Sequence, residues 1–277
     1  MSLLYFDEWR DTRATIRYIV QIMGKCCLAV NTPEPLYKHV MLTVNQVGLS
    51  TGELKKDNHT FEINLDLIDQ LIVVKIDEKE ETMIVKSGRT IQEYYQFIFD
   101  TLHDNGIDIT INTKPYNIPY EKTLDKDDKE RIFKPKTAYH ALRLMQQAQY
   151  DHYQFLHSRN IKDVKTGLFW DKFDVTSIFY VEGNDEYTVS LCYYFGDKYR
   201  ESPYYIIKIN PFKQDKINLK QVEPSYAEYN GKDGSFLIYE EDLESIIRRD
   251  EVLLTFFNSA YQALLSGVSS KLSQHDK

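Results

Sequence analysis

Apolar residues recur at helical spacing over the first thirty positions of the chain, which predicts an amphipathic helix. Asp7 is a suitable N-cap, and Pro33 and Pro35 forbid helix beyond the segment. Gly24 falls within or just after the helix, where it ends it or lets another backbone approach closely. The apolar side of this helix comprises Trp9, Ile16, Ile19, Val20, Met23 and Cys27, and the other side Arg10, Arg13 and Arg17.

Alternation of apolar and polar residues then predicts a run of strands. In residues 59–66, Phe61, Ile63 and Leu65 point to one face, with acidic and amide side chains on the other. Residues 71–76 are apolar on both faces, as in a central strand. Further predicted strands are Val40–Val44, entered through Leu36–Val40 with His39 at its opening, a short one at Thr82–Lys86, and Ile107–Ile111.

A capping box begins the next helix. Thr90 and Glu93 have the required spacing, and Asn105-Gly106 supplies a left-handed stop. Residues 114–136 contain three prolines and a dense mixture of charges, which is typical of an exposed connection between two parts of a fold.

The second half repeats the order helix, strands, helix. A helix is expected from about Thr137 to His157, and a very apolar helix capped by Asp250 ends the half. The strands expected between them are residues 173–181, 187–195, 205–209 and 235–239.

These elements predict an α+β fold, a mostly antiparallel sheet with long amphipathic helices packed on it. We expect an N-terminal half at residues 1–113, the charged connection at 114–136 and a C-terminal half at 137–277, or one continuous domain. The shared order of elements raises the hypothesis of a pseudo-repeat, although no residue-level repeat accompanies it.

Composition narrows the class of protein. A net charge of −8 and a pI near 5.4 argue against a nucleic-acid partner, which requires a basic face. Three cysteines, Cys26, Cys27 and Cys192, do not form a disulfide framework and are expected as reduced, buried thiols. With no signal-peptide pattern and no apolar run of spanning length, we expect a cytoplasmic protein without a membrane partner.

Common catalytic signatures are missing from the sequence. Met23-Gly24-Lys25 fails as a phosphate loop because Ile19 and Cys26 occupy the positions that need glycine and a hydroxyl. The seven histidines form no recognised metal-binding spacing, so we expect no metal and no cofactor.

A few polar and aromatic residues remain as candidates for a site. His39 is either a ligand-contacting imidazole near Gln21 and Lys25 or a strand-end histidine bonded to backbone, and the second reading is favoured. Trp170 either walls a pocket or fills the junction between the halves. The residues Glu62, Asn64 and Asp66 form a stripe of paired carboxylates or, more simply, a solvated sheet face, and His152 is best read as a satisfied histidine at the edge of the core.

The ordered set of these motifs resembles an uncharacterised bacterial family, the domain-of-unknown-function family 5996. The residues that carry the resemblance include Trp9, Gln21-Ile22-x-Gly24-Lys25, His39-Val40, Gly48-Leu49-x-Thr51, Phe61-x-Ile63-x-x-Asp66, Tyr94-Tyr95, Phe169-Trp170-x-x-Phe173-Asp174 and Leu237-x-Tyr239. The chain departs from the family pattern at Tyr37, Lys38 and Leu168, and near Gly183. The resemblance implies a cytoplasmic bacterial protein and transfers no catalytic residue.

The leading functional hypothesis is a small-molecule-binding or interaction protein with an aromatic-lined site. The expected wall of that site comprises Trp9, Gln21, Lys25, His39, Trp170 and Asp174. The first alternative is a hydrolase-like enzyme that uses His39 with an acidic partner such as Glu62, Asp66 or Asp174. The second is a structural subunit of a homo-oligomer.

Overall fold

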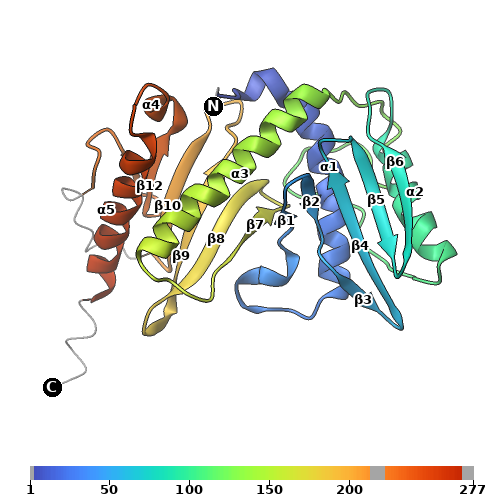
Figure 1. Ribbon diagram of the computed structural model, residues 1–277, viewed down its shortest axis with the longest axis horizontal. Coiled ribbons are helices and arrows are strands. Elements are labelled where there is room, and N and C mark those ends of the chain that lie inside the picture. Colours follow the sequence, from blue (N-terminus) through green and yellow to red (C-terminus); the bar gives the residue numbers. More distant parts are fainter. Residues whose placement is uncertain (1–2, 213–221, 270–277) are drawn as a thin grey trace. The chain divides into compact units, whose positions relative to one another are not determined.

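The computed structural model describes residues 3–212 and 222–269 of the chain and confirms an α+β fold (Figure 1). The helical elements are α1 (Phe6–Val30), η1 (Pro35–Val40), α2 (Ile91–Asp104), α3 (Pro135–Ser158), α4 (Glu240–Glu244) and α5 (Arg249–Ser269). The strands are β1 (Thr43–Val44), β2 (Gly48–Ser50), β3 (Leu54–Lys56), β4 (His59–Asp66), β5 (Leu71–Ile76), β6 (Lys79–Ile84), β7 (Lys165–Phe169), β8 (Asp174–Val181), β9 (Asn184–Tyr194), β10 (Tyr204–Asn210), β11 (Glu228–Asn230) and β12 (Ser235–Tyr239).

Two compact units divide the described chain. The first comprises Glu8–Gln146 and Gly167–Asp174; the second comprises the described parts of Met1–Asp7, Gln147–Thr166 and Val175–Lys277. The division falls inside α3, and the predicted connection at residues 114–136 lies within the first unit.

The first sheet has the order β1-β2-β4-β5-β6, and β3 pairs with β4 off this path. Its core face is the one that alternation predicts, because Phe61, Ile63 and Leu65 on β4 are all buried. Helix α2 lies alongside β5 and β6 (Figure 1), and the predicted Thr90–Glu93 capping box begins it.

The second sheet has the order β11-β12-β10-β9-β8-β7, and the pairs β9–β10, β10–β12 and β11–β12 are antiparallel. Helix α5 packs against β10, where Tyr205 and Ile207 are fully buried. The strand orders of the two sheets differ, and the pseudo-repeat stays a prediction.

One predicted strand is wrong, and the predicted strand Val40–Val44 is shorter than expected, since β1 covers Thr43–Val44. Residues 35–40 form the 3-10 segment η1, which is interrupted at Leu36 and Tyr37. Their φ values of 61° and 55° lie in the left-handed region, which a strand does not use. His39 therefore lies in η1 and does not open a strand. Residues 107–111 follow the left-handed Gly106 (φ 80°) without pairing as a strand.

Candidate functional site

A stripe of long polar side chains follows one side of α1 at intervals of four residues: Arg13, Arg17, Gln21 and Lys25. Positions four apart in a helix lie one above the other, so these side chains share a face. Gln21 is fully buried, Lys25 is 6% exposed and Arg13 is 9% exposed. Arg13 therefore lies against protein, contrary to its predicted place on the polar side of the helix.

Arg17, Gln21 and Lys25 of the stripe bind the backbone of residues 112–119, which we call the strap. The Gln21 side chain bonds to both backbone groups of Tyr116, an arrangement we call the clamp. Its Nε2 donates to the Tyr116 carbonyl at 2.6 Å, and its Oε1 accepts from the Tyr116 amide at 2.8 Å. Lys25 Nζ donates to the carbonyls of Asn112 and Lys114, each at 2.6 Å. Two of the predicted site residues are thus occupied by the protein's own main chain.

Trp170 joins Gln21 and Lys25 at this place. Its indole lies so close to α1 that a Cβ added to Gly24 would stand 2.0 Å from Cδ1, so only glycine fits there. Lys25 Nζ is 5.9 Å from the centre of the indole, and the Tyr116 ring meets the indole edge-on at 6.3 Å. Gln21, Lys25 and Trp170 therefore lie together in the structure, where the strap covers them.

Burial controls the electrostatics of the stripe. Removal from water lowers the pKa of Lys25, because the charged ammonium loses hydration. Burial likewise lowers the pKa of Arg17, and the nearby carboxylates of Asp171 and Asp174 only partly oppose this. For Lys25 and Arg17, the loss of hydration outweighs the attraction of nearby negative charge.

The other predicted wall residues have different neighbours. The Trp9 ring is buried 6.1 Å from that of Phe173, and the Arg13 guanidinium lies 5.7 Å from the centre of each. Asp174 is 2% exposed at the start of β8.

His39 makes its hydrogen bonds inside its own turn. The backbone amide of Glu34 donates to Nδ1 at 3.0 Å, and Asn31 donates to the His39 carbonyl at 2.8 Å. Asp66 Oδ1 accepts from the amides of Ile68 and Asp69 at 2.8 and 2.7 Å, as in a turn-capping carboxylate. Within the described chain, no hydrogen bond or ion pair links His39 to Asp66.

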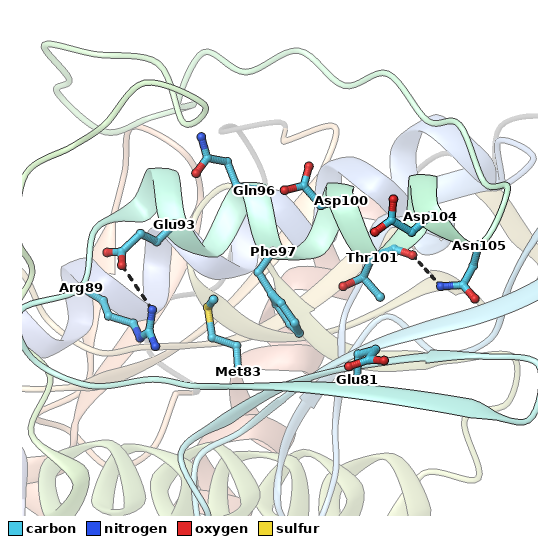
Figure 2. Close-up of a pocket in the computed structure, with 10 residues that line it drawn as sticks. All are labelled: Glu81, Met83, Arg89, Glu93, Gln96, Phe97, Asp100, Thr101, Asp104 and Asn105. Atoms are coloured by element: carbon cyan, nitrogen blue, oxygen red, sulfur yellow. Dashed lines mark hydrogen bonds and ion pairs between the residues drawn. The ribbon is translucent and has the colours of Figure 1, made fainter.

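Sequence reasoning missed a groove of about 540 Å³ between α2 and β6. Figure 2 shows Phe97 extending from α2 toward β6, with Met83 beside it. The lining residues are Glu81, Met83, Arg89, Glu93, Gln96, Phe97, Asp100, Thr101, Asp104 and Asn105. An apolar floor with carboxylates around it suits a cation that also carries apolar surface.

One acidic side chain of the groove, Glu93, is paired with a cation, and the other acidic side chains are not paired in the described chain. Arg89 is paired with Glu93 at 3.2 Å, and Glu93 also accepts the Thr90 amide in the capping box. The side chains of Glu81, Asp100 and Asp104 accept no hydrogen bond and form no ion pair within the described chain, and all three are exposed. The groove therefore presents net negative charge to solvent.

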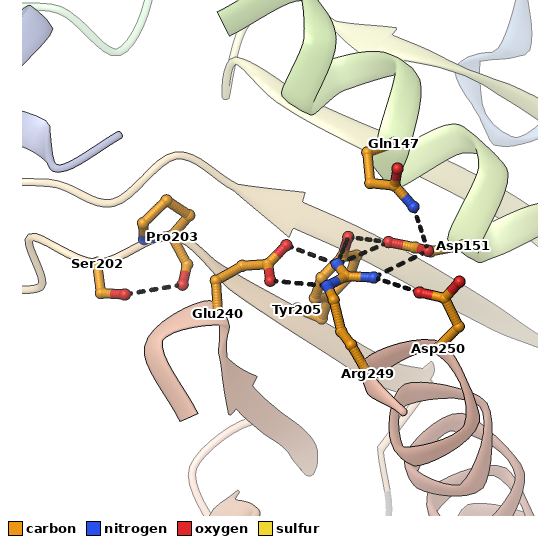
Figure 3. Close-up of polar contacts among 8 residues, drawn as sticks. All are labelled: Gln147, Asp151, Ser202, Pro203, Tyr205, Glu240, Arg249 and Asp250. Carbon is orange, nitrogen blue, oxygen red and sulfur yellow. Dashed lines mark hydrogen bonds and ion pairs between the residues drawn. The ribbon is translucent and has the colours of Figure 1, made fainter. Parts of the chain in front are cut away.

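A second polar cluster lies in the other unit, around Arg249 at the start of α5 (Figure 3). Its guanidinium contacts Asp151 Oδ2 at 2.9 Å and Glu240 Oε1 at 2.7 Å, and donates to the Tyr205 hydroxyl at 3.1 Å. The Tyr205 hydroxyl in turn donates to Asp151. Four segments are held together by one cation.

Most of this cluster is closed to solvent. The side chains of Asp151 and Glu240 are 2% and 6% exposed, and that of Arg249 is 22% exposed. Burial raises the pKa of Glu240, although Arg249 opposes the change, and burial raises the pKa of Tyr205 well above 10. The contacts tie α3, β10, α4 and α5 together, which is a structural role.

His152 is fully buried beside this cluster's Tyr205, with ring centres 6.1 Å apart. Its Nδ1 lies 3.1 Å from Ser177 Oγ, and burial lowers the imidazole pKa to about 3, so the ring is neutral. The interpretation of His152 as a core histidine agrees with this burial.

Residues 3–212 and 222–269 contain neither a membrane-spanning helix nor a group of side chains that could hold a metal ion. No helix there combines the length and apolar composition of a span. No three histidine, cysteine or acidic side chains gather there as a metal site.

The comparisons with known proteins give a family but no activity. Residues 1–186 match the model of a family described as "Family of unknown function (DUF5996)", and the match covers more than half of the chain. The chain therefore belongs to this family, as its motifs suggest. No curated protein and no solved structure matches it.

Proposed function

We propose that this member of a family of unknown function is a cytoplasmic, non-catalytic binding protein that takes an organic cation in the groove between α2 and β6. The observation that carries the proposal is the groove's uncompensated charge: Glu81, Asp100 and Asp104 line one concave surface without a counter-ion in the described chain. Opposite charge in a concavity of this size attracts and retains a ligand.

The groove also indicates the shape of the ligand. Asp100 and Asp104 are one helical turn apart, roughly 6 Å along the axis, and Glu81 belongs to the neighbouring strand. Phe97 and Met83 offer apolar surface to a hydrocarbon chain. A linear diamine, with a methylene chain between two ammonium groups, has the matching chemistry.

The hydrolase alternative has less support. A general base must reach its substrate and is usually oriented by an acid. His39 is 5% exposed, and its Nδ1 is occupied by the Glu34 amide. The binding proposal needs no such group.

Calorimetric titration with 1,6-diaminohexane tests the proposal. Saturable binding is expected, and the double variant Asp100→Asn/Asp104→Asn should weaken it about tenfold, or roughly 1.4 kcal/mol, because two carboxylates of the groove lose their charge. The matched control is Asp57→Asn/Glu78→Gln, which removes the same charge from exposed positions that do not line the groove. Equal weakening by both double variants, or no saturable binding to the native protein, would overturn the proposal.

A further inference from the structure

Lys25 is a buried cation that has neutral partners only. Its ammonium is held by the carbonyls of Asn112 and Lys114, and it forms no ion pair with a carboxylate within the described chain. A buried charge normally requires an opposite charge, since carbonyl dipoles replace its hydration only in part. The environment of Lys25 therefore favours a bound anion.

A second observation at the same place points the same way. Trp170 is 8% exposed, and its indole N–H, a hydrogen-bond donor, has no acceptor among the described residues. The indole nitrogen faces α1 at Gly24, the residue beside Lys25, where an added Cβ would be 2.5 Å from it. Buried donors are normally satisfied, so an unpaired one next to an uncompensated cation indicates a missing acceptor.

We infer that Lys25 and Trp170 form a binding site for a carboxylate on an aromatic or apolar small molecule, and that the strap covers this site. In the covered form, the carbonyls of Asn112 and Lys114 stand where carboxylate oxygens bind the ammonium. The bound carboxylate supplies the charge that these carbonyls lack, and the Trp170 indole N–H gains an acceptor. The Trp170 ring supplies the apolar contact.

The strap can separate from α1 as one segment. Residues 112–119 contain no helix or strand, and Tyr116 is 53% exposed. Helix α1 anchors the strap through Gln21 and Lys25, through Arg17 at the Asn117 carbonyl (3.3 Å) and through the Tyr18 hydroxyl at the Pro119 carbonyl (3.4 Å). The Leu124 amide adds a backbone bond to the Thr113 carbonyl at 2.9 Å. Strap amides and carbonyls released from these anchors can bond to water, which limits the cost of opening.

Gln21 therefore sets the balance between the covered and open forms. It holds the strap through the backbone amide and carbonyl of Tyr116, and it is not itself part of the carboxylate site. If only the open form binds, the apparent affinity is reduced by the fraction of molecules that are closed. A variant that weakens the Gln21 clamp should bind more tightly, which a purely structural role for these residues does not predict.

The test uses the full-length protein labelled with 5-fluorotryptophan, which gives two fluorine resonances because the chain has only Trp9 and Trp170. Trp170→Phe assigns them. On titration with sodium benzoate, the Trp170 resonance should shift saturably, and benzamide, the neutral analogue, should leave it unmoved. Gln21→Met should raise benzoate affinity about tenfold, because the covered form loses two hydrogen bonds to Tyr116. Each bond contributes about 1 kcal/mol, and water replaces part of that contribution. Lys25→Met should abolish binding.

The comparison of benzoate with benzamide needs no variant. It therefore tests whether the site requires a carboxylate even if Lys25→Met does not fold. An unmoved Trp170 resonance in both the native protein and Gln21→Met would overturn the inference, as would equal shifts with benzamide. This experiment and the diamine titration probe different sites. Absence of benzoate binding at Trp170 would therefore leave the proposal for the groove between α2 and β6 unaffected.

Discussion

Two cations removed from water, Lys25 and Arg249, are stabilised in different ways. Arg249 is bonded to Asp151 and Glu240, so its charge is more than balanced within one unit. Lys25 is bonded to two peptide carbonyls and to no carboxylate within the described chain. A closed network such as that of Arg249 holds a fold together, whereas the imbalance at Lys25 is the condition under which a ligand gains most by binding.

The same contrast separates the acidic side chains. Asp151 and Glu240 are buried and paired with Arg249. Asp100 and Asp104 are exposed along a groove and have no ion-pair partner in the described chain. Carboxylates therefore have a structural role where a cation accompanies them, and are available for binding where none does.

The largest effect is expected from Arg249→Met, which leaves two buried carboxylates facing each other without a cation. Loss of one member of a buried ionic network costs about 3–5 kcal/mol of unfolding free energy. Urea denaturation measures it. The matched control is Arg248→Met, because the Arg248 side chain is 75% exposed and pairs with the exposed Glu251. Its loss should cost less than about 1 kcal/mol. Similar losses for the two variants would show that the Arg249 cluster does not stabilise the second unit.

A smaller effect is expected from Gln21→Met, an apolar replacement of similar length. It leaves the amide and carbonyl of Tyr116 without their partners, which costs about 1–3 kcal/mol unless the strap opens to water. Urea denaturation and chymotrypsin cleavage after Tyr116, which Asn117 follows, both report on this change. Gln262→Met, at an exposed position of α5, is the control for the substitution itself. A Gln21→Met protein as stable and as resistant to chymotrypsin as the control would contradict the clamp.

Local patterns predicted much of the fold. Strand β4 has the predicted bounds because strict alternation over residues 59–66 fixes both its period and its buried face. Helix α2 begins at the predicted capping box because the Thr90–Glu93 interaction is local. Helix η1 could not be predicted in this way, since Leu36 and Tyr37 adopt a backbone conformation that their residue types disfavour.

The candidate sites were predicted less completely. The four-residue spacing of Gln21 and Lys25 places both on one face of a helix, which the sequence shows directly. Their partners are main-chain carbonyls, however, and these carry no sequence signal. The Arg249 cluster was missed because Asp151 and Glu240 come from distant segments that only the tertiary fold brings together.

The titration of Lys25 in the folded protein tests most directly whether its ammonium lacks an anion. Burial lowers its pKa, so between that lowered value and the ordinary one near 10.5 the unfolded chain binds more protons, and this group's contribution to stability rises with pH. The measurement follows the Cε resonance of Lys25 in ¹³C-lysine-labelled protein, assigned with Lys25→Arg, with and without benzoate. The account predicts a pKa below 10.5 in the free protein and an upward shift when benzoate binds. A pKa at or above 10.5 in the free protein, or one that benzoate leaves unchanged, would contradict it.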